Sequence, residues 1–300
     1  MKNILLAIND AYMDPAKVCL SSLFDTNKAD EYRVVIFESS LSDSSRKELT
    51  EYIRGRRSEV YFEHIDWRNF SKAPKRENIS IETYYRLLAF HILQDTDKIL
   101  YLDADTLVTG DISDLFGLEM DSFCIAGVED QGLVKGDYYH KTKLGIGRNG
   151  IYINGGVVLM NLERIRRAIS IDDVFDCIYK HRFQLKYQDQ DVLNILFNKE
   201  TYLLPEEYNM IPAYGSAGEV ISCTISEVLE REKLPKIIHY MGMAYKPWRD
   251  GGYGYRYFMK YYMQCRKAGC YELLRKIKRN ARIRILSLVA QYIEERGRVR

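Results

Sequence analysis

Two carboxylates two residues apart, Asp103 and Asp105, directly follow the apolar run of residues 99–102. A short continuous apolar run is typical of a strand buried on both faces of a parallel sheet. Ligands of open α/β sheets bind at the carboxyl ends of strands, where residues i and i+2 of an extended chain project to the same side. The pattern therefore predicts a site for Mg²⁺ or Mn²⁺, which take carboxylates and substrate phosphates as ligands. A loop cap without any ligand is the alternative interpretation.

A histidine at the end of another apolar run offers a different kind of ligand. Residues 236–240 read KIIHY, which predicts a short strand with His239 near its end. An imidazole beside two carboxylates would complete a mixed oxygen and nitrogen site that suits Mn²⁺. A histidine satisfied within the core is the alternative.

Glycine-rich segments mark two further places where the backbone can approach a ligand. Gly155 and Gly156 precede the apolar run VVLMN, and such a pair serves either close approach or a β-bulge. Residues 242–254 form a glycine-rich loop that carries Lys246, a cation suited to phosphate.

The segment YQDQD, residues 187–191, gathers amide and carboxylate groups at the start of a predicted helix. Asp189 there is either a helix cap or a site residue. Gln190 follows it directly, so both side chains are candidates for contact with a ligand.

The elements that would position these residues alternate between strands and helices. Apolar runs predict strands over residues 3–8, 32–37, 60–64, 98–102, 123–128, 156–161 and 236–240. Helical spacing predicts helices over residues 15–24, 42–54, 83–93, 171–181 and 189–197, with Arg86 on the third of these. This βαβ organisation predicts an α/β fold with a parallel sheet.

Composition excludes several classes of protein. A chain of 300 residues with 46% hydrophobic content can bury a large core. The six cysteines show no CxxC pair and no regular spacing, so we expect reduced thiols in the cytoplasm rather than a zinc cluster or a disulfide framework. The apolar run at the N-terminus is too short for a signal peptide, and no stretch reaches the roughly 18 apolar residues of a membrane span.

Positive charge is concentrated at the C-terminal end. Residues 256–300 carry 13 Lys and Arg against three Glu, a net charge of +10, whereas residues 1–255 carry −8. Apolar residues recur there at steps of three and four, which predicts an amphipathic helix: Leu274, Ile277, Ala281, Ile285, Leu288 and Tyr292. A basic amphipathic helix suits an anionic membrane surface, so we expect a peripheral location on the inner face of the cytoplasmic membrane. A solvated helix is the alternative. Nucleic acid is not predicted, because aromatic residues do not interleave with the cations.

Five segments taken in order, SIETYYRL, LYLDADTLV, NGGVVLMNL, YQDQDVLN and HYMGMAYKPW, resemble glycosyltransferase family 8. This family contains retaining galactosyl- and glucosyltransferases, among them bacterial lipooligosaccharide α-galactosyltransferases. The resemblance covers most of residues 1–250. It implies a catalytic domain with the GT-A fold, a Rossmann-like α/β fold that binds nucleotide sugars, which we place over residues 1–255. The charge and apolar spacing described above predict a basic helical tail over residues 256–300. The implied reaction moves galactose or glucose from a UDP-sugar to a glycan or glycolipid acceptor in cell-surface polysaccharide or lipopolysaccharide synthesis.

The resemblance also assigns roles to residues. It implies that Mn²⁺, or Mg²⁺, is held by Asp103, Asp105 and His239. The residues implied to contact the nucleotide sugar are Ala7, Asn9, Tyr12, Arg86, Asp103, Ala104, Asn154, Asp189, Gln190, Gly242 and Lys246. Gln190 and Asp189 are the implied catalytic residues. Because a neutral amide is a poor nucleophile, the resemblance points to attack on the face that the leaving group vacates, and a covalent intermediate on Asp189 is the alternative.

Two other functions fit parts of the sequence. A haloacid-dehalogenase-like phosphatase also follows a strand with Asp-x-Asp-x-Thr and would use Asp103 as its nucleophile, but that motif normally opens its fold. A membrane-docked adaptor without catalytic activity would account for the basic tail, but it leaves the acidic and glycine motifs unexplained.

Overall fold

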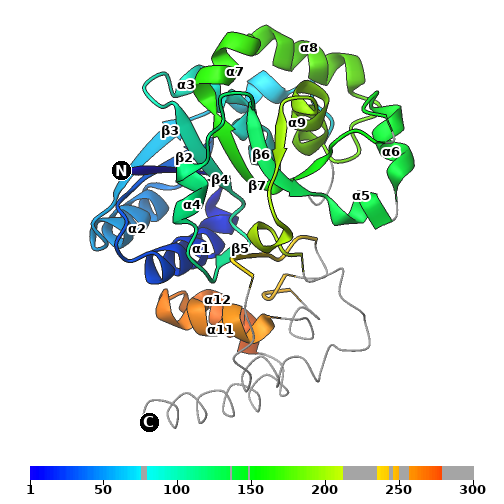
Figure 1. The fold of residues 1–300 in the computed structure, drawn as a ribbon. Coiled ribbons are helices and arrows are strands. Elements are labelled where there is room, and N and C mark those ends of the chain that lie inside the picture. The colour runs from blue at the N-terminus through cyan, green and yellow to red at the C-terminus, as the bar shows by residue number, and fades with distance from the viewer. Residues whose placement is uncertain are drawn as a thin grey trace.

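The computed structural model describes residues 1–75, 80–135, 137–147, 149–211, 235–242, 246–249 and 257–278. Within these residues a seven-stranded sheet has the order β3-β2-β1-β4-β7-β6-β8, and a second sheet pairs β5 with β9 (Figure 1). The strands are β1 (Lys2–Ala7), β2 (Tyr32–Glu38), β3 (Glu59–His64), β4 (Lys98–Leu102), β5 (Thr106–Val108), β6 (Ile125–Glu129), β7 (Ile153–Asn161), β8 (Thr201–Leu203) and β9 (Ile237–His239).

The large sheet is parallel in its first half and mixed in its second. β1 pairs in parallel with both β2 and β4, and β2 pairs in parallel with β3. β7 runs antiparallel to β4 on one side and to β6 on the other. The expectation of a parallel sheet is therefore wrong for β7, because a continuous apolar run indicates burial on both faces but carries no information about strand direction.

The helices predicted over residues 15–24, 42–54, 171–181 and 189–197 are present, together with several short ones that were not predicted. The α-helices are α1 (Met13–Thr26), α2 (Asp43–Arg54), α3 (Ala89–Ile92), α4 (Ser113–Gly117), α5 (Gln131–Lys135), α6 (Tyr138–Lys143), α7 (Leu162–Ala168), α8 (Ile171–His181), α9 (Asp189–Phe197), α11 (Phe258–Lys267) and α12 (Tyr271–Lys278). Ser42 begins α2 by accepting a hydrogen bond from Ser45 N, and Ser170 begins α8 with a capping box.

The helix predicted over residues 83–93 differs from the expectation. It begins earlier, as the 3₁₀-helix η3 (Ile81–Leu88), and becomes α-helical only in α3. Ser80 precedes it without a capping hydrogen bond from its side chain. A 3₁₀-helix has three residues per turn, so Thr83 and Arg86, three residues apart, lie on the same side of η3.

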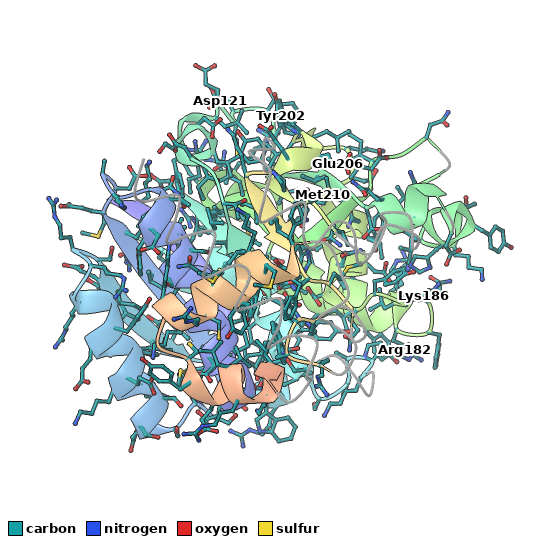
Figure 2. The ribbon with its side chains drawn as sticks, turned by 90° about the horizontal axis from the view of Figure 1, so that it is seen from below. Asp121, Arg182, Lys186, Tyr202, Glu206 and Met210 are labelled. Atoms are coloured by element: carbon teal, nitrogen blue, oxygen red, sulfur yellow. The ribbon has the colours of Figure 1, made fainter. Side chains whose placement is uncertain are left out.

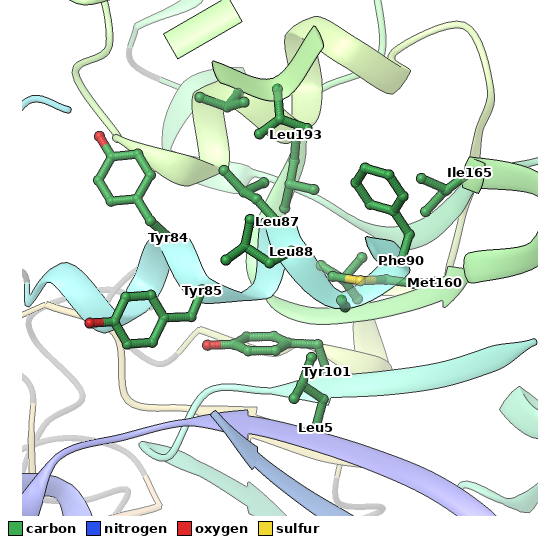
Figure 3. Packing of buried hydrophobic residues seen from close by; sticks show 14 of the residues in the cluster. Leu5, Tyr84, Tyr85, Leu87, Leu88, Phe90, Tyr101, Met160, Ile165 and Leu193 are labelled. Atoms are coloured by element: carbon green, nitrogen blue, oxygen red, sulfur yellow. The ribbon is translucent and has the colours of Figure 1, made fainter. Parts of the chain in front are cut away.

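Alternate residues of the central strands pack on opposite faces of the sheet. Leu5 and Tyr101 belong to a cluster with η3, α7, α8 and α9, whereas Ile4 and Leu100 belong to a cluster with α1 and α2. Figure 3 shows residues of η3, including Leu88, packed between the strands that carry Leu5 and Tyr101 and the helices beyond. The two clusters pack on opposite faces of the sheet and hold the carboxyl ends of β1 and β4 in place.

The described part of the basic tail packs against the rest of the protein. α11 and α12 form a third buried cluster with Val18 of α1, Leu107 of β5 and Ile238 of β9 (Figure 1). Leu274 and Ile277, two residues of the predicted apolar face, are buried in this cluster. The remainder of that face, from Ala281 to Tyr292, lies outside the described residues, and the division at residue 255 stays a prediction. None of the helices in the described part has the length and apolar content that a bilayer crossing requires.

Candidate active site

The turn that follows β4 carries the two aspartates of the acidic motif. Thr106 closes this turn, since its backbone N–H and its hydroxyl both donate to the Asp103 carbonyl at 3.1 and 2.8 Å. The expectation of an extended chain from Asp103 to Asp105 is therefore wrong. The turn, rather than strand alternation, directs both carboxylates toward the same neighbour.

That neighbour is His239 at the end of β9. β5 and β9 pair antiparallel with Thr106 opposite His239, which places the imidazole beside the turn. Nε2 of His239 lies 3.6 Å from Asp103 Oδ2 and 3.4 Å from Asp105 Oδ1. One donor atom from each residue lies within 4.8 Å of the other two. Two carboxylate oxygens and one imidazole nitrogen at this spacing fit a divalent cation such as Mn²⁺ or Mg²⁺.

Lys246 lies at the edge of this group. Its ammonium forms an ion pair with Oδ2 of Asp105 and lies 5.4 Å from the ring centroid of Tyr12. Burial alone would raise the pKa of Asp105, but the charge on Lys246, which also bonds to this carboxylate, holds the pKa below its ordinary value. Asp105 is therefore ionised and able to act as a ligand at neutral pH.

Arg86, 4% exposed, joins the acidic turn to the start of α9. Its Nη2 lies 3.3 Å from Asp103 Oδ1, its Nε lies 2.8 Å from Asp189 Oδ2, and its Nη1 donates to the Gly155 carbonyl. The guanidinium stacks on Tyr101, 3.9 Å from the ring centroid, and the Tyr101 hydroxyl donates to Asp103 Oδ1 at 2.7 Å. Burial raises the pKa of Asp189 to about 6, although the Arg86 charge opposes the shift. Arg86 thus holds two carboxylates in fixed positions.

The side-chain amide of Gln190 makes hydrogen bonds through both its oxygen and its nitrogen. Its Oε1 accepts from Gly155 N at 2.8 Å, and its Nε2 donates to Asp130 Oδ2 at 3.1 Å and to the Tyr152 hydroxyl at 3.2 Å. Gln188, two residues before Gln190, has φ 50°, an uncommon value for a residue with a side chain. This strained backbone aims Asp189 and Gln190 from the first turn of α9 into the cavity.

These groups line a cavity of about 710 Å³. Every site residue named from the sequence lies on its wall: Ala7, Asn9, Tyr12, Arg86, Asp103, Ala104, Asp105, Asn154, Asp189, Gln190, Gly242, Lys246 and His239. Ala7, Asn9 and Tyr12 come from the end of β1 and the turn η1 (Asp10–Tyr12), where Asn9 Oδ1 accepts from Ala11 N at 3.1 Å. Gly242 has φ 86°, a conformation that favours glycine. The structure thus brings the predicted set together, and the role of each residue stays a prediction.

Sequence reasoning missed other polar residues of the cavity and its wall. Lys75 and Tyr187 line the cavity, and Tyr101 was read as part of an apolar run although its hydroxyl bonds to Asp103. Asp130 is 5% exposed, and its carboxylate accepts from both Gln190 and Asn154. Its position directly after β6, at the edge where β4 ends in Asp103, was the only available signal.

A sequence model of glycosyl transferase family 8 matches residues 3–252. The chain belongs to this family. It is 28% identical over 253 residues to a lipopolysaccharide 1,2-glucosyltransferase of Escherichia coli, a match that covers 83% of this chain and 73% of that enzyme. It is 25% identical over 247 residues to the glycosyltransferase GlyF of Streptococcus pneumoniae, covering 82% of this chain and 57% of GlyF.

Solved structures of glycosyltransferases share the fold. The galactosyltransferase LgtC, in complex with donor and acceptor sugar analogs, matches with a TM-score of 0.77 and 24% identity over 88% of this chain and 95% of LgtC. GlyE of Streptococcus pneumoniae matches with a TM-score of 0.65 and 21% identity over 88% of this chain and 61% of GlyE. The predicted GT-A fold is confirmed. Membership in family 8 makes the chain a glycosyltransferase and removes the phosphatase and adaptor interpretations.

Proposed function

We propose that this family 8 glycosyltransferase moves galactose or glucose from a UDP-sugar to a glycan or glycolipid acceptor and retains the configuration of the donor. One observation carries the proposal. The candidate metal ligands Asp103, Asp105 and His239 line the same cavity as the polar side chains of Asp189 and Gln190. A cation site and a polar wall opposite it are what a donor with a diphosphate and a hexose requires.

Asp103, Asp105 and His239 would hold Mn²⁺, with Mg²⁺ as the second choice. When bound, the ion would neutralise negative charge that develops on the diphosphate as the bond to sugar C1 breaks. Lys246 lies beside Asp105 and lines the same cavity, so its ammonium would meet the same phosphates.

The arrangement of the polar wall favours transfer on one face of the sugar. Gln190 is a neutral amide, and the Asp189 carboxylate is paired with Arg86, so neither side chain is a free nucleophile. In the reaction that we propose, the bond from C1 to the diphosphate oxygen breaks and the acceptor oxygen bonds to C1 on the same face. The acceptor proton passes to the departing phosphate oxygen. Asp189 as a nucleophile is the alternative.

The acceptor is proposed from the relatives and from the tail. The Escherichia coli relative is named for lipopolysaccharide, and the tail of residues 256–300 carries a net charge of +10. We assign the chain to lipopolysaccharide or other surface glycan synthesis, docked peripherally on the inner face of the cytoplasmic membrane. A glycolipid acceptor in that leaflet would then meet the cavity at high local concentration.

The test is release of nucleotide from a panel of sugar nucleotides with and without Mn²⁺. We expect turnover of UDP-galactose or UDP-glucose that needs the ion, and a loss of more than about 100-fold in Asp105→Asn, which removes one ligand. Asp121→Asn is the matched control, since Asp121 is exposed and labelled at the outer edge of the molecule in Figure 2. Full activity in excess chelator would contradict the proposal.

A separate measurement decides the stereochemistry. The anomeric proton coupling of the product should show an α linkage, and mass spectrometry of the enzyme during turnover should show no added hexose. A β linkage would overturn retention, whereas a hexose on the peptide that carries Asp189 would establish the covalent route.

A further inference from the structure

Asn209 follows η4 (Glu206–Tyr208) and lies between two residues of the site. It is 1% exposed. Its Oδ1 lies 3.0 Å from Nδ1 of His239, and its Nδ2 lies 3.0 Å from Oδ1 of Asn154. One amide therefore connects a candidate metal ligand to a residue on the donor-sugar side of the cavity.

The orientation of the Asn154 amide is fixed by its own partners. Its Oδ1 lies 3.0 Å from the backbone nitrogen of Gly156, a group that can only donate. Its Nδ2 lies 3.0 Å from Oδ2 of Asp130, and a carboxylate oxygen accepts. Both contacts require the oxygen of Asn154 on the side of Gly156 and its NH₂ group on the side of Asp130.

The orientation of the Asn154 amide determines that of the Asn209 amide, which in turn determines which imidazole nitrogen of His239 carries a hydrogen. Because Asn154 presents an oxygen to Asn209, Asn209 must present its NH₂ group there and its oxygen to His239. An amide oxygen can only accept, so Nδ1 of His239 carries the hydrogen. Nε2 is left as the nitrogen that a cation would bind, and it is Nε2 that faces Asp103 and Asp105.

The backbone keeps Asn209 at this place beside β9. His239 N donates to Met210 O at 2.8 Å, and Met210 N donates to Ile237 O at 2.9 Å. Met210, labelled in Figure 2, also forms a parallel bridge with Ile238. Asn209 and His239 therefore hold their relative positions through main-chain bonds on neighbouring residues.

We propose that Asn209 is a positioning residue that fixes the Nδ1–H tautomer of His239, so that Nε2 is ready to bind a cation. The proposal rests on the metal role that the proposed function gives to His239. Partners that hold the other ring nitrogen of a metal-binding histidine commonly change metal affinity by about 10- to 100-fold when they are lost. Hydrogen bonds also connect His239 through Asn209 and Asn154 to Asp130, which accepts from Gln190.

The direct test is nitrogen NMR of ¹⁵N-histidine-labelled protein without metal or nucleotide, followed to a pH at which His239, assigned by substitution, is neutral. The wild type should show His239 protonated at Nδ1, whereas Asn209→Leu, which cannot accept, should show a mixture of tautomers. Calorimetric titration with Mn²⁺ alone should show affinity reduced by about 10- to 100-fold in Asn209→Leu. Asn209→Asp still accepts from Nδ1, so it should keep the Nδ1 hydrogen although it can no longer donate to Asn154.

Asn27→Leu is the matched control for loss of a buried asparagine. Asn27 is 6% exposed, and its amide bonds to backbone groups at Leu23, Gly110 and Ile112, away from the cavity. It should lose stability without a change in Mn²⁺ affinity. A neutral His239 in the wild type with its hydrogen on Nε2 and none on Nδ1, or an unchanged tautomer and Mn²⁺ affinity in Asn209→Leu, would overturn the proposal. The tautomer measurement needs no sugar nucleotide, so it stands even if the protein turns over no UDP-sugar.

Discussion

Gly156 of β7 and His239 of β9 lie so close that a Cβ atom at position 156 would be 2.1 Å from Cε1 of the imidazole. Side-chain atoms do not approach to this distance, so the imidazole occupies space that only glycine leaves free. The glycine pair that the sequence singled out for close approach to a ligand thus also makes room for a candidate ligand of the metal.

Gly156→Ala should therefore displace His239 and reduce Mn²⁺ affinity by more than about 10-fold, measured by titration calorimetry without nucleotide. Overpacking should also lower the free energy of unfolding by about 1–3 kcal/mol. Gly117→Ala is the control, because a Cβ atom there would meet nothing within 4 Å. Equal Mn²⁺ affinities in the two variants would contradict this account of the site.

Lys246→Met should change Mn²⁺ binding in opposite directions with and without nucleotide. The Lys246 ammonium pairs with Asp105 and repels a second cation, so Mn²⁺ alone should bind at least about 5-fold more tightly to the variant. In the presence of UDP the variant should bind Mn²⁺ more weakly than the wild type, since a phosphate partner is lost. Lys2→Met removes a lysine paired with Asp30 at the surface and should change neither affinity.

Asp189 should contribute a measurable pH dependence to stability. Burial raises its pKa to about 6 from the ordinary 3.8, so the folded chain binds this proton more tightly than the unfolded chain. The resulting stabilisation is full below about pH 4 and is lost as the pH rises through 6. Between pH 4.5 and 7.5 the wild type should lose about 2 kcal/mol of unfolding free energy relative to Asp189→Asn. If the unfolding free energies of the two proteins change equally with pH across this range, the Asp189 carboxyl does not titrate as described.

The tail should mediate binding to anionic membranes. Each Lys or Arg near an anionic leaflet contributes about 1 kcal/mol, and six of them lie between Arg275 and Arg284. Because α12 completes a buried cluster, the informative variant keeps it, removes residues 279–300 and carries Arg275→Glu and Lys276→Glu, both at exposed positions. Sedimentation with anionic liposomes should fall at least about 10-fold, while nucleotide release in solution should persist.

The control for the two substitutions is the pair Lys47→Glu and Arg54→Glu on α2, which makes the same change of charge as Arg275→Glu with Lys276→Glu, on another exposed helix. It should sediment like the wild type. If the tail variant also sediments like the wild type, membrane docking through this segment is ruled out.

The strands around the site were predictable because burial on both faces leaves a clear sequence signal. The run of residues 98–102 became β4 with the same bounds, and the helices predicted over residues 171–181 and 189–197 became α8 and α9 with the same bounds. The direction of β7 was not predictable, since apolar runs in parallel and antiparallel central strands look alike. β5 and β8 have three residues each, too few to show any period.

The candidate site was predictable where residue types cluster in short motifs. Asp103, Asp105 and Gln190 stand in such motifs, whereas Asp130 and Asn209 stand alone in segments without a repeated pattern. Their importance depends on contacts with residues far away in the chain, such as the bond from Asn154 to Asp130 and the bond from Asn209 to Asn154. Isolated polar residues of this kind can be recognised as site residues only from the folded structure.

The pairing of β5 with β9 also sets the order in which the site can assemble. Asp105 and Lys246 are 141 residues apart in sequence, and the imidazole arrives with the same late segment. Closing so long a loop is slow compared with forming the neighbouring βαβ units of the first half. A chain that has folded only through β4 possesses the carboxylates but lacks the nitrogen ligand. Tight Mn²⁺ binding would therefore be among the last properties acquired during refolding, which makes it a sensitive reporter of the completed fold.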